Sequence, residues 1–185
     1  MKHIVIAIDA NPGFLQQAGV MLFSLVKHNA DAITLHILHT PEAKQPFELQ
    51  REMISHFAGT TEVTLQYHEV TWDSIKALGL TLYNNLPLTT YFRLLIPKIL
   101  AEDVEVCLYL DGDMLIRGSI DPLFSLTAST DWRAAAVMTN VLQSHMDNLN
   151  LTRYFNAGML MMNLKAWRNN NVSANIINFI VQYPN

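Results

Sequence analysis

Two carboxylate side chains two positions apart, Asp111 and Asp113, are the strongest candidates for chemistry in this chain. They follow the apolar run 106–110, which has the length and composition of a buried strand. Alternate residues of a strand point to the same side, so both carboxylates can converge at its end. Carboxylates that close repel unless a proton or a cation lies between them. Mg²⁺ and Mn²⁺ prefer oxygen ligands and often bind phosphate as well, and Gly112 leaves room for a ligand at the backbone. We therefore predict a metal-bridged diphosphate site.

A second polar pair, Asp9 and Asn11, follows the β-rich run 4–8 and precedes the turn signal Pro12-Gly13. In a parallel α/β sheet, ligands bind at the carboxyl ends of the strands, so both pairs are expected to open into one crevice. Simpler interpretations stay open. Asn11 also suits the N-cap of a following helix, and Asp-Gly is common in solvated turns.

Composition limits the class of protein. At 185 residues a single domain, 1–185, is expected, with half of the residues hydrophobic and 15% charged. A net charge of −4 gives no electrostatic footprint for nucleic acid. The one cysteine, Cys107, lies in the predicted buried strand and is expected to be inert. No run approaches the roughly 18 apolar residues of a membrane-spanning helix. The opening residues are typical of a strand rather than a signal peptide, so we expect a cytoplasmic protein.

Strands and helices are predicted to alternate along the chain. Further strands are expected at 33–39, 63–70, 134–138 and 155–164, and helices at about 14–28, 47–57, 89–100 and 173–182, with a turn at 121–122. The helix at 89–100 has Pro97 near its predicted end. This alternation predicts an α/β fold with a doubly wound, mainly parallel central sheet.

Six segments follow one another in a characteristic order. They are IVIAIDAN at 4–11, TTYFRL at 89–94, LYLDGD at 108–113, GSI with PL at 118–123, YFNAGM at 154–159 and NLKAWR at 163–168. This set resembles the retaining family 8 glycosyltransferases, which include lipopolysaccharide glucosyl- and galactosyltransferases and the glycogenins. The resemblance implies the GT-A (Rossmann-like) fold, a UDP-glucose or UDP-galactose donor, Mn²⁺ or Mg²⁺, a saccharide or glycolipid acceptor, and retention of configuration.

The resemblance also implies roles for individual residues. It implies metal ligation by Asp111 and Asp113, catalytic roles for these two with Arg93 and Asn156, and donor binding by Ala7, Asp9, Asn11, Arg93, Asp111, Gly112, Asn156 and Ala157. Asp9 would accept from the uracil N–H, Arg93 would lie along the diphosphate, and Asn156 would face the donor sugar. A divalent cation and a guanidinium there would stabilise the charge that develops on the leaving diphosphate.

The chain departs from the family pattern in two places. Where relatives carry an acidic residue after the strand 134–138, this chain has Met138-Thr139-Asn140. Relatives also continue past the last helix into an Asp/Gln-rich segment and a later His that completes the metal site, whereas this sequence stops at Asn185. We therefore expect the donor-binding part of such an enzyme, truncated at its C-terminus, with weak or absent transfer. Peripheral association with the inner membrane face is expected only of a full-length form.

Two other functions compete with the transferase. The chain could be a nucleotide-sugar-binding module without transfer activity. Haloacid-dehalogenase-type phosphatases also place Asp-x-Asp after an apolar strand. Their motif normally lies on the first strand and is followed by Thr or Val, whereas Met114 follows it here and no downstream Asp-Asp pair is present.

The histidines, which could bind a metal, and the remaining methionines and tryptophans are interpreted as structural. On one strand His36 and His39 would face opposite sides, which disfavours a metal pair. The other histidines are expected on the surface or rim: His3, His28, His56, His68 and His145. Core packing is expected of Met159, Met161, Met162, Trp72, Trp132 and Trp167.

Overall fold

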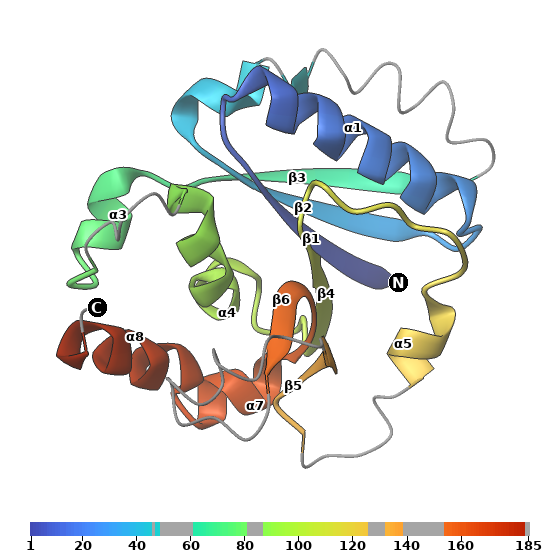
Figure 1. Cartoon of the computed structure of the whole chain (residues 1–185). Coiled ribbons are helices and arrows are strands. Elements are labelled where there is room, and N and C mark those ends of the chain that lie inside the picture. The colour runs from blue at the N-terminus through green and yellow to red at the C-terminus, as the bar shows by residue number, and fades with distance from the viewer. Residues whose placement is uncertain (46, 49–60, 81–86, 126–131, 139–153, 184–185) are drawn as a thin grey trace.

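The computed structural model describes residues 1–45, 47–48, 61–80, 87–125, 132–138 and 154–183. Within these ranges, six strands form one sheet in the order β3-β2-β1-β4-β6-β5 (Figure 1). They are β1 (Lys2–Ile8), β2 (Ile33–His39), β3 (Val63–Glu69), β4 (Val106–Leu110), β5 (Ala134–Met138) and β6 (Phe155–Asn163). β1 pairs in parallel with β2 and β4, and β2 with β3, whereas β6 is antiparallel to β4 and β5. The predicted α/β fold with a mainly parallel sheet is confirmed.

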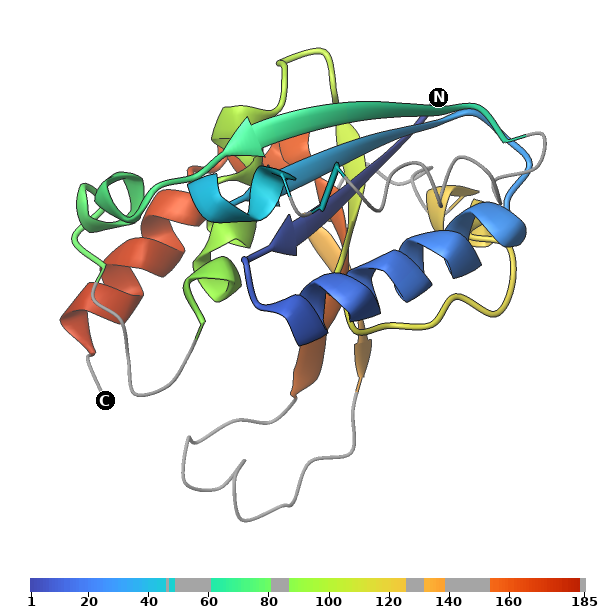
Figure 2. The same ribbon diagram turned by 90° about the horizontal axis from the view of Figure 1, so that it is seen from above.

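Helices cover both faces of the sheet (Figures 1 and 2). The described helices are α1 (Pro12–Lys27), α3 (Trp72–Lys76), α4 (Ile96–Ile99), α5 (Asp121–Ser125), α7 (Leu164–Asn169) and α8 (Val172–Gln182), with 3-10 turns η1 (Pro41–Ala43) and η2 (Leu88–Leu94). In the described part of the chain, no helix combines the length and the apolar character that a membrane crossing needs.

Side chains alternate between two hydrophobic clusters along β1. Ile4 and Ile6 point to the face that α1 covers, whereas Val5 and Ala7 point to the face covered by η2, α4, α7 and α8. Because both faces are buried, the strand is apolar without a break from residue 4 to residue 8. Helix α1 meets its face through residues at helical spacing, which are Leu15, Ala18, Leu22 and Leu25.

Three predicted elements differ in the structure. The helix expected at 89–100 is the 3-10 turn η2 followed by the short α4, because Pro97, which lacks an N–H, occupies the first turn of α4 instead of its end. The turn expected at Asp121-Pro122 is the start of α5. The strand expected to reach 164 ends at Asn163, whose side chain accepts from Ala166 N and begins the unpredicted α7. The helix expected at 47–57 lies mostly outside the described residues.

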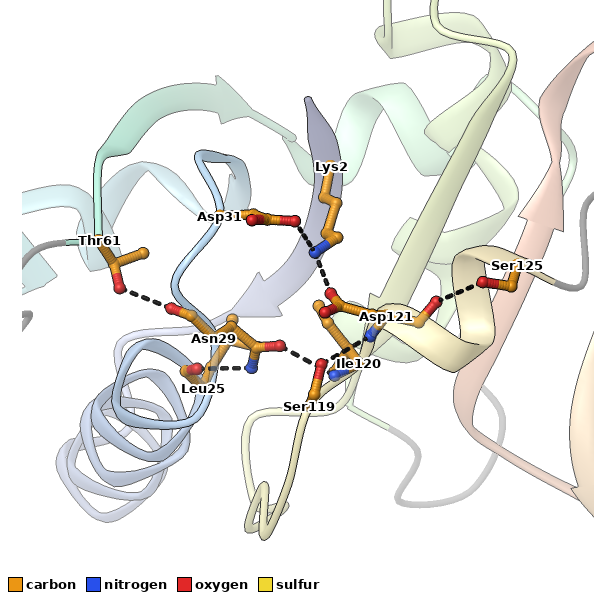
Figure 3. A network of polar contacts seen from close by, with 9 residues as sticks. All are labelled: Lys2, Leu25, Asn29, Asp31, Thr61, Ser119, Ile120, Asp121 and Ser125. Atoms are coloured by element: carbon orange, nitrogen blue, oxygen red, sulfur yellow. Dashed lines mark hydrogen bonds and ion pairs between the residues drawn. The ribbon is translucent and has the colours of Figure 1, made fainter.

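The segment after β4 is fastened to the C-terminal half of α1, alongside which it runs toward α5 (Figure 2). Buried Ser24 accepts from Ile116 N at 2.9 Å. Buried Asn29 accepts from Ile120 N at 2.9 Å while donating to Leu25 O at 2.8 Å (Figure 3). These bonds satisfy backbone groups that the turn after β4 leaves unpaired.

An ion-pair cluster lies beside this fastening. The ammonium of Lys2, at the start of β1, contacts the carboxylates of Asp31 and Asp121 (Figure 3). Lys2 therefore joins β1 to the loop before β2 and to the first turn of α5. This cluster lies at the opposite end of β1 from Asp9, so it supports the fold without entering the predicted crevice.

Candidate functional site

The two segments that carry the predicted acidic residues leave the sheet at the same end, the carboxyl end of β1 and β4. β1 and β4 are parallel neighbours, with Ile4 opposite Leu108 and Ile6 opposite Leu110. Asp9 follows β1 directly, and Asp111 follows β4 directly. The two segments thus emerge side by side at the carboxyl ends of adjacent parallel strands, where α/β proteins bind ligands.

Asp111 is held by three hydrogen bonds. Its Oδ1 accepts from the Tyr109 hydroxyl at 2.6 Å and from Arg93 Nη2 at 3.3 Å, and its backbone N–H donates to Gly158 O at 2.7 Å. Within the described residues its Oδ2 has no hydrogen-bond donor. The side chain is 34% exposed. One carboxylate oxygen is therefore fixed, and the other is free for a ligand.

Arg93 joins three elements at this point. From η2, its Nε donates to Thr90 O at 3.0 Å and its Nη1 donates to Ala157 O at 2.6 Å, in addition to the contact with Asp111. Its guanidinium carbon lies 4.7 Å from the centre of the Tyr109 ring, within the range of a cation–π contact. Arg93 thus places a positive charge between η2, the exit of β4 and the beginning of β6.

Tyr109, which sequence reasoning missed, lies directly beneath Asp111 in β4. Its side chain is 1% exposed. Burial raises the pKa of its hydroxyl, the positive charge of Arg93 opposes this rise, and the negative charges of Asp111 and Asp113 add to it. The hydroxyl therefore stays protonated and able to donate. Its position two residues before Asp111, and hence on the same side of the strand, was the available signal.

Asn156 and Gly158 face Asp111 from β6. Asn156 Oδ1 accepts from Gly158 N at 2.7 Å, so part of its side chain satisfies the backbone locally. A Cβ on Gly158 would lie 2.8 Å from Asp111 Oδ2 and 2.9 Å from Asn156 Oδ1. The pairing of β6 with β5 is irregular here, as is common for bulges beside functional sites. Gly158 is therefore the position that lets the two predicted site residues approach each other.

Asp113 and Gly112 lie in a turn beyond the end of β4. Asp113 is exposed. Gly112 is buried, and a Cβ there would lie 3.0 Å from Phe14 Cζ and 3.2 Å from Ala18 Cβ. The absence of a side chain at Gly112 thus lets the turn pack against α1, and room for a ligand at its backbone stays a prediction.

At the end of β1, the side chains of Asp9 and Asn11 accept hydrogen bonds from nearby backbone N–H groups. Asn11 Oδ1 accepts from Gly13 N at 3.0 Å and Phe14 N at 3.3 Å, which makes Asn11 the N-cap of α1. Asp9 Oδ1 in turn accepts from Asn11 N at 2.9 Å. The Asn11 amide nitrogen and the second oxygen of Asp9 are directed to no described partner. Ala7, by contrast, is buried in the core.

The histidines are less scattered than expected. His3 Nδ1 lies 2.9 Å from His36 Nε2, and His36 Nδ1 lies 3.1 Å from His68 Nε2, so three imidazoles form a chain across β1, β2 and β3. His36, in the middle of this chain, is buried, whereas His3 and His68 on either side of it are only partly buried. Burial, and then the neighbouring His3 and His68, lowers the pKa of His36 to about 4. The sequence alone does not reveal this arrangement, because the three histidines lie on three different strands, each about 32 residues or more from the next.

His39 points to the other face of β2, as expected, with its ring edge-on to Tyr67. Among the described residues, no group of three or more His, Cys, Asp or Glu side chains has the geometry to hold a metal ion. Thr139 and Asn140, where the resemblance led us to expect an acidic residue, lie outside the described residues, as do His56 and His145. Cys107 is buried, and burial raises the pKa of its thiol to about 12, which keeps it protonated.

Comparison with known proteins matches nearly the whole chain. A family model described as glycosyl transferase family 8 matches residues 3–185. The lipopolysaccharide 1,3-galactosyltransferase of Salmonella typhimurium is 28% identical over 189 aligned residues, which cover 96% of this chain and 53% of that protein. The lipopolysaccharide 1,2-glucosyltransferase of Escherichia coli is 26% identical over 157 residues, covering 81% of this chain and 44% of that protein. The chain spans about half the length of these two relatives.

Solved structures show the same fold. The galactosyltransferase LgtC in complex with donor and acceptor sugar analogs superposes with a TM-score of 0.69 at 23% identity, covering 98% of this chain and 66% of that chain. An active-site mutant of LgtC gives a TM-score of 0.75 at 25% identity, covering 98% and 64%. The expected GT-A fold is confirmed.

Proposed function

Because the chain belongs to glycosyl transferase family 8, we propose that it binds a UDP-hexose at the exit of β4 and transfers the hexose to a saccharide acceptor with retention of configuration. The relatives' names support glucose or galactose as the hexose and a lipopolysaccharide or related surface glycan as the acceptor. We place this reaction in the cytoplasm, with peripheral membrane association for a longer form of the protein.

The observation that carries the proposal is the environment of Asp111. A carboxylate with one fixed and one free oxygen stands at the edge of a parallel sheet, with exposed Asp113 two residues further on and the Arg93 guanidinium against it. Two carboxylates are a suitable partial ligand set for Mn²⁺ or Mg²⁺, whose remaining positions phosphate oxygens commonly fill. When bound, the cation would supply positive charge to the diphosphate that leaves the sugar.

The chain's own residues would orient the donor. Arg93 is 15% exposed, and its three hydrogen bonds fix its guanidinium against Oδ1 of Asp111. A fixed cation there costs no reorganisation when charge develops on the phosphate, which is how preorganised groups lower a barrier. On the β1 side, Asp9 and Asn11 would hold the nucleoside through the atoms that the N-cap does not use. On the β6 side, Asn156 and Ala157 would face the sugar.

Titration with UDP in the presence and absence of Mn²⁺ tests the binding step. We expect Asp111→Asn and Asp113→Asn each to abolish most of the Mn²⁺-dependent gain in UDP affinity. Asp73→Asn, an exposed carboxylate on α3, is the matched control and should bind like the unaltered chain. Unchanged Mn²⁺-dependent affinity in both site variants would refute the proposed site.

A second function, binding of the nucleotide sugar without transfer, is favoured by one observation. Within the described residues, the two carboxylates have no third metal-ligating side chain beside them. Transfer of labelled glucose or galactose from the UDP-sugar to lipopolysaccharide acceptors, compared with donor hydrolysis, separates the two functions. Binding without turnover supports the module, and turnover supports the transferase.

A further inference from the structure

We propose that Tyr109 is a positioning residue for the cation site, because its hydroxyl holds Oδ1 of Asp111 and thereby presents Oδ2 to the cation. The inference rests on the proposed function and deepens it. It assigns a role to a buried side chain that touches neither the cation nor the donor and acts only through Asp111.

The two carboxylate oxygens of Asp111 differ in their contacts, because both hydrogen bonds from side chains go to Oδ1. The Tyr109 hydroxyl is the shorter of the two contacts to Oδ1, at 2.6 Å, and Arg93 Nη2 is the longer, at 3.3 Å. A charge-assisted O–H···O⁻ bond of that length belongs to the stronger class of protein hydrogen bonds. Rotation of the carboxylate toward a cation through Oδ1 would break it. The structure therefore favours ligation through Oδ2.

The opposite side of the carboxylate is bounded by β6. The Asp111 N–H donates to Gly158 O at 2.7 Å, and the space where a Gly158 Cβ would stand adjoins Oδ2. The carboxylate is thus held by Tyr109 from beneath and by the backbone of β6 from the side. Partners that orient a ligating group in this way commonly change metal affinity when they are removed, although they never touch the metal.

A purely structural role for Tyr109 is the competing explanation. Its ring packs in the hydrophobic cluster on the η2 side of the sheet, and its buried hydroxyl needs some partner, which Asp111 supplies. The two explanations differ in what the hydroxyl does for the cation. Tyr109→Phe separates them, because it keeps the ring in the core and beneath the Arg93 guanidinium while it removes only the hydroxyl.

The experiment measures the Mn²⁺ concentration that half-saturates UDP binding, with the thermal midpoint of the metal-free chain as a check on folding. We expect Tyr109→Phe to raise that concentration roughly 10–100-fold. Tyr109→Leu should behave similarly toward Mn²⁺ but lose additional stability, because it also removes the ring. Tyr183→Phe, at the exposed residue that follows α8, should leave both quantities unchanged.

The outcomes separate this inference from the proposed function. If Asp111→Asn and Asp113→Asn lose Mn²⁺-dependent binding while folded Tyr109→Phe keeps it, the inference fails and the proposed function stands. If neither Asp variant changes binding, both fail. A second measurement tests the inference even if Tyr109→Phe does not fold. It is the tyrosine ultraviolet difference spectrum of the Tyr154→Phe variant, which removes the signal of Tyr154 and keeps that of Tyr109. Mn²⁺ with UDP should perturb that spectrum, and an unperturbed spectrum would overturn the inference.

Discussion

Gly158 and Asp111 approach each other so closely across the β4–β6 pair that a Cβ on Gly158 would lie 2.8 Å from Asp111 Oδ2. A real Cβ essentially never comes that near a carboxylate oxygen, so an alanine at position 158 would force the carboxylate to move. The added Cβ could not shift away from Asp111 either, because it would also lie 2.9 Å from Asn156 Oδ1.

Gly158→Ala should therefore weaken Mn²⁺-dependent UDP binding by roughly tenfold or more, an effect of the size seen when groups that orient metal ligands are disturbed. Isothermal titration with UDP and Mn²⁺ measures it. Gly118→Ala is the matched control, because a Cβ there meets no atom within 4 Å. Equal losses in the two variants would show that the closeness of Gly158 to Asp111 has no bearing on the site.

Gly112→Ala should act on stability instead. A Cβ at that position meets Phe14 Cζ at 3.0 Å and Ala18 Cβ at 3.2 Å, and such overpacking costs about 1–3 kcal/mol of unfolding free energy. Urea denaturation measures the loss. Combining Gly112→Ala with Phe14→Leu makes room for the methyl group and should recover part of it, whereas simple additivity of the two single losses would refute the steric explanation.

The buried His36 should make stability depend on pH. Its pKa is lowered to about 4 in the folded chain, against about 6.5 for an exposed histidine. Between these values the unfolded chain binds more protons than the folded one, so the free energy of unfolding rises with pH. The contribution of His36 to the free energy of unfolding is fully present above about pH 6.5 and is lost as the pH falls toward about 4. The total loss is at most about 3 kcal/mol.

Urea denaturation across that pH window is the measurement. His36→Leu should flatten the dependence, because no group at position 36 then titrates. The pKa values of His3 and His68 are also lowered, mainly by burial, so some slope should remain. His28→Asn, on the exposed end of α1, should keep the slope of the unaltered chain. A slope that survives His36→Leu undiminished would assign the effect to other groups.

Asn29→Ala should loosen the segment that follows the proposed cation site. It leaves the Ile120 N–H without its acceptor, and an unsatisfied buried group costs about 1–3 kcal/mol. Denaturation should report that loss, and amide exchange at Ile120 should accelerate. Asn178→Ala on the exposed face of α8 serves as the control. Slow exchange at Ile120 in the Asn29 variant would mean that another group holds the segment.

The fold class and most strands were predictable from local patterns. The bounds of β2 agree with the prediction residue for residue, and all seven of its positions are buried. The form of 88–99 was not predictable in the same way. Its apolar spacing suits a regular helix, but the structure has a 3-10 turn over Leu88–Leu94 and a short α-helix that begins at Ile96, with Pro97 in its first turn.

The candidate site was predictable only in part. Motifs identify Asp111, Asp113, Arg93 and Asn156, whose roles remain predictions, but a motif does not state which oxygen of Asp111 is already bound. Tyr109 and Gly158 depend on contacts between strands that are distant in sequence. The chain of His3, His36 and His68 likewise exists only through the parallel registers of three strands.

The antiparallel register of β6 against β4 determines which residues of β6 lie beside Asp111. Leu110 stands opposite Met159, which brings Gly158 O to the Asp111 N–H. A slip by two residues, which preserves the inward and outward faces, would carry Asn156 and Ala157 about 7 Å along the strand. In the observed register the buried Met161 and Met162 lie opposite Leu108 and Cys107, and a slip would break this packing. Weaker UDP binding at the proposed site is therefore an expected result of substituting Met161 or Met162, although neither is among the residues proposed to touch the donor.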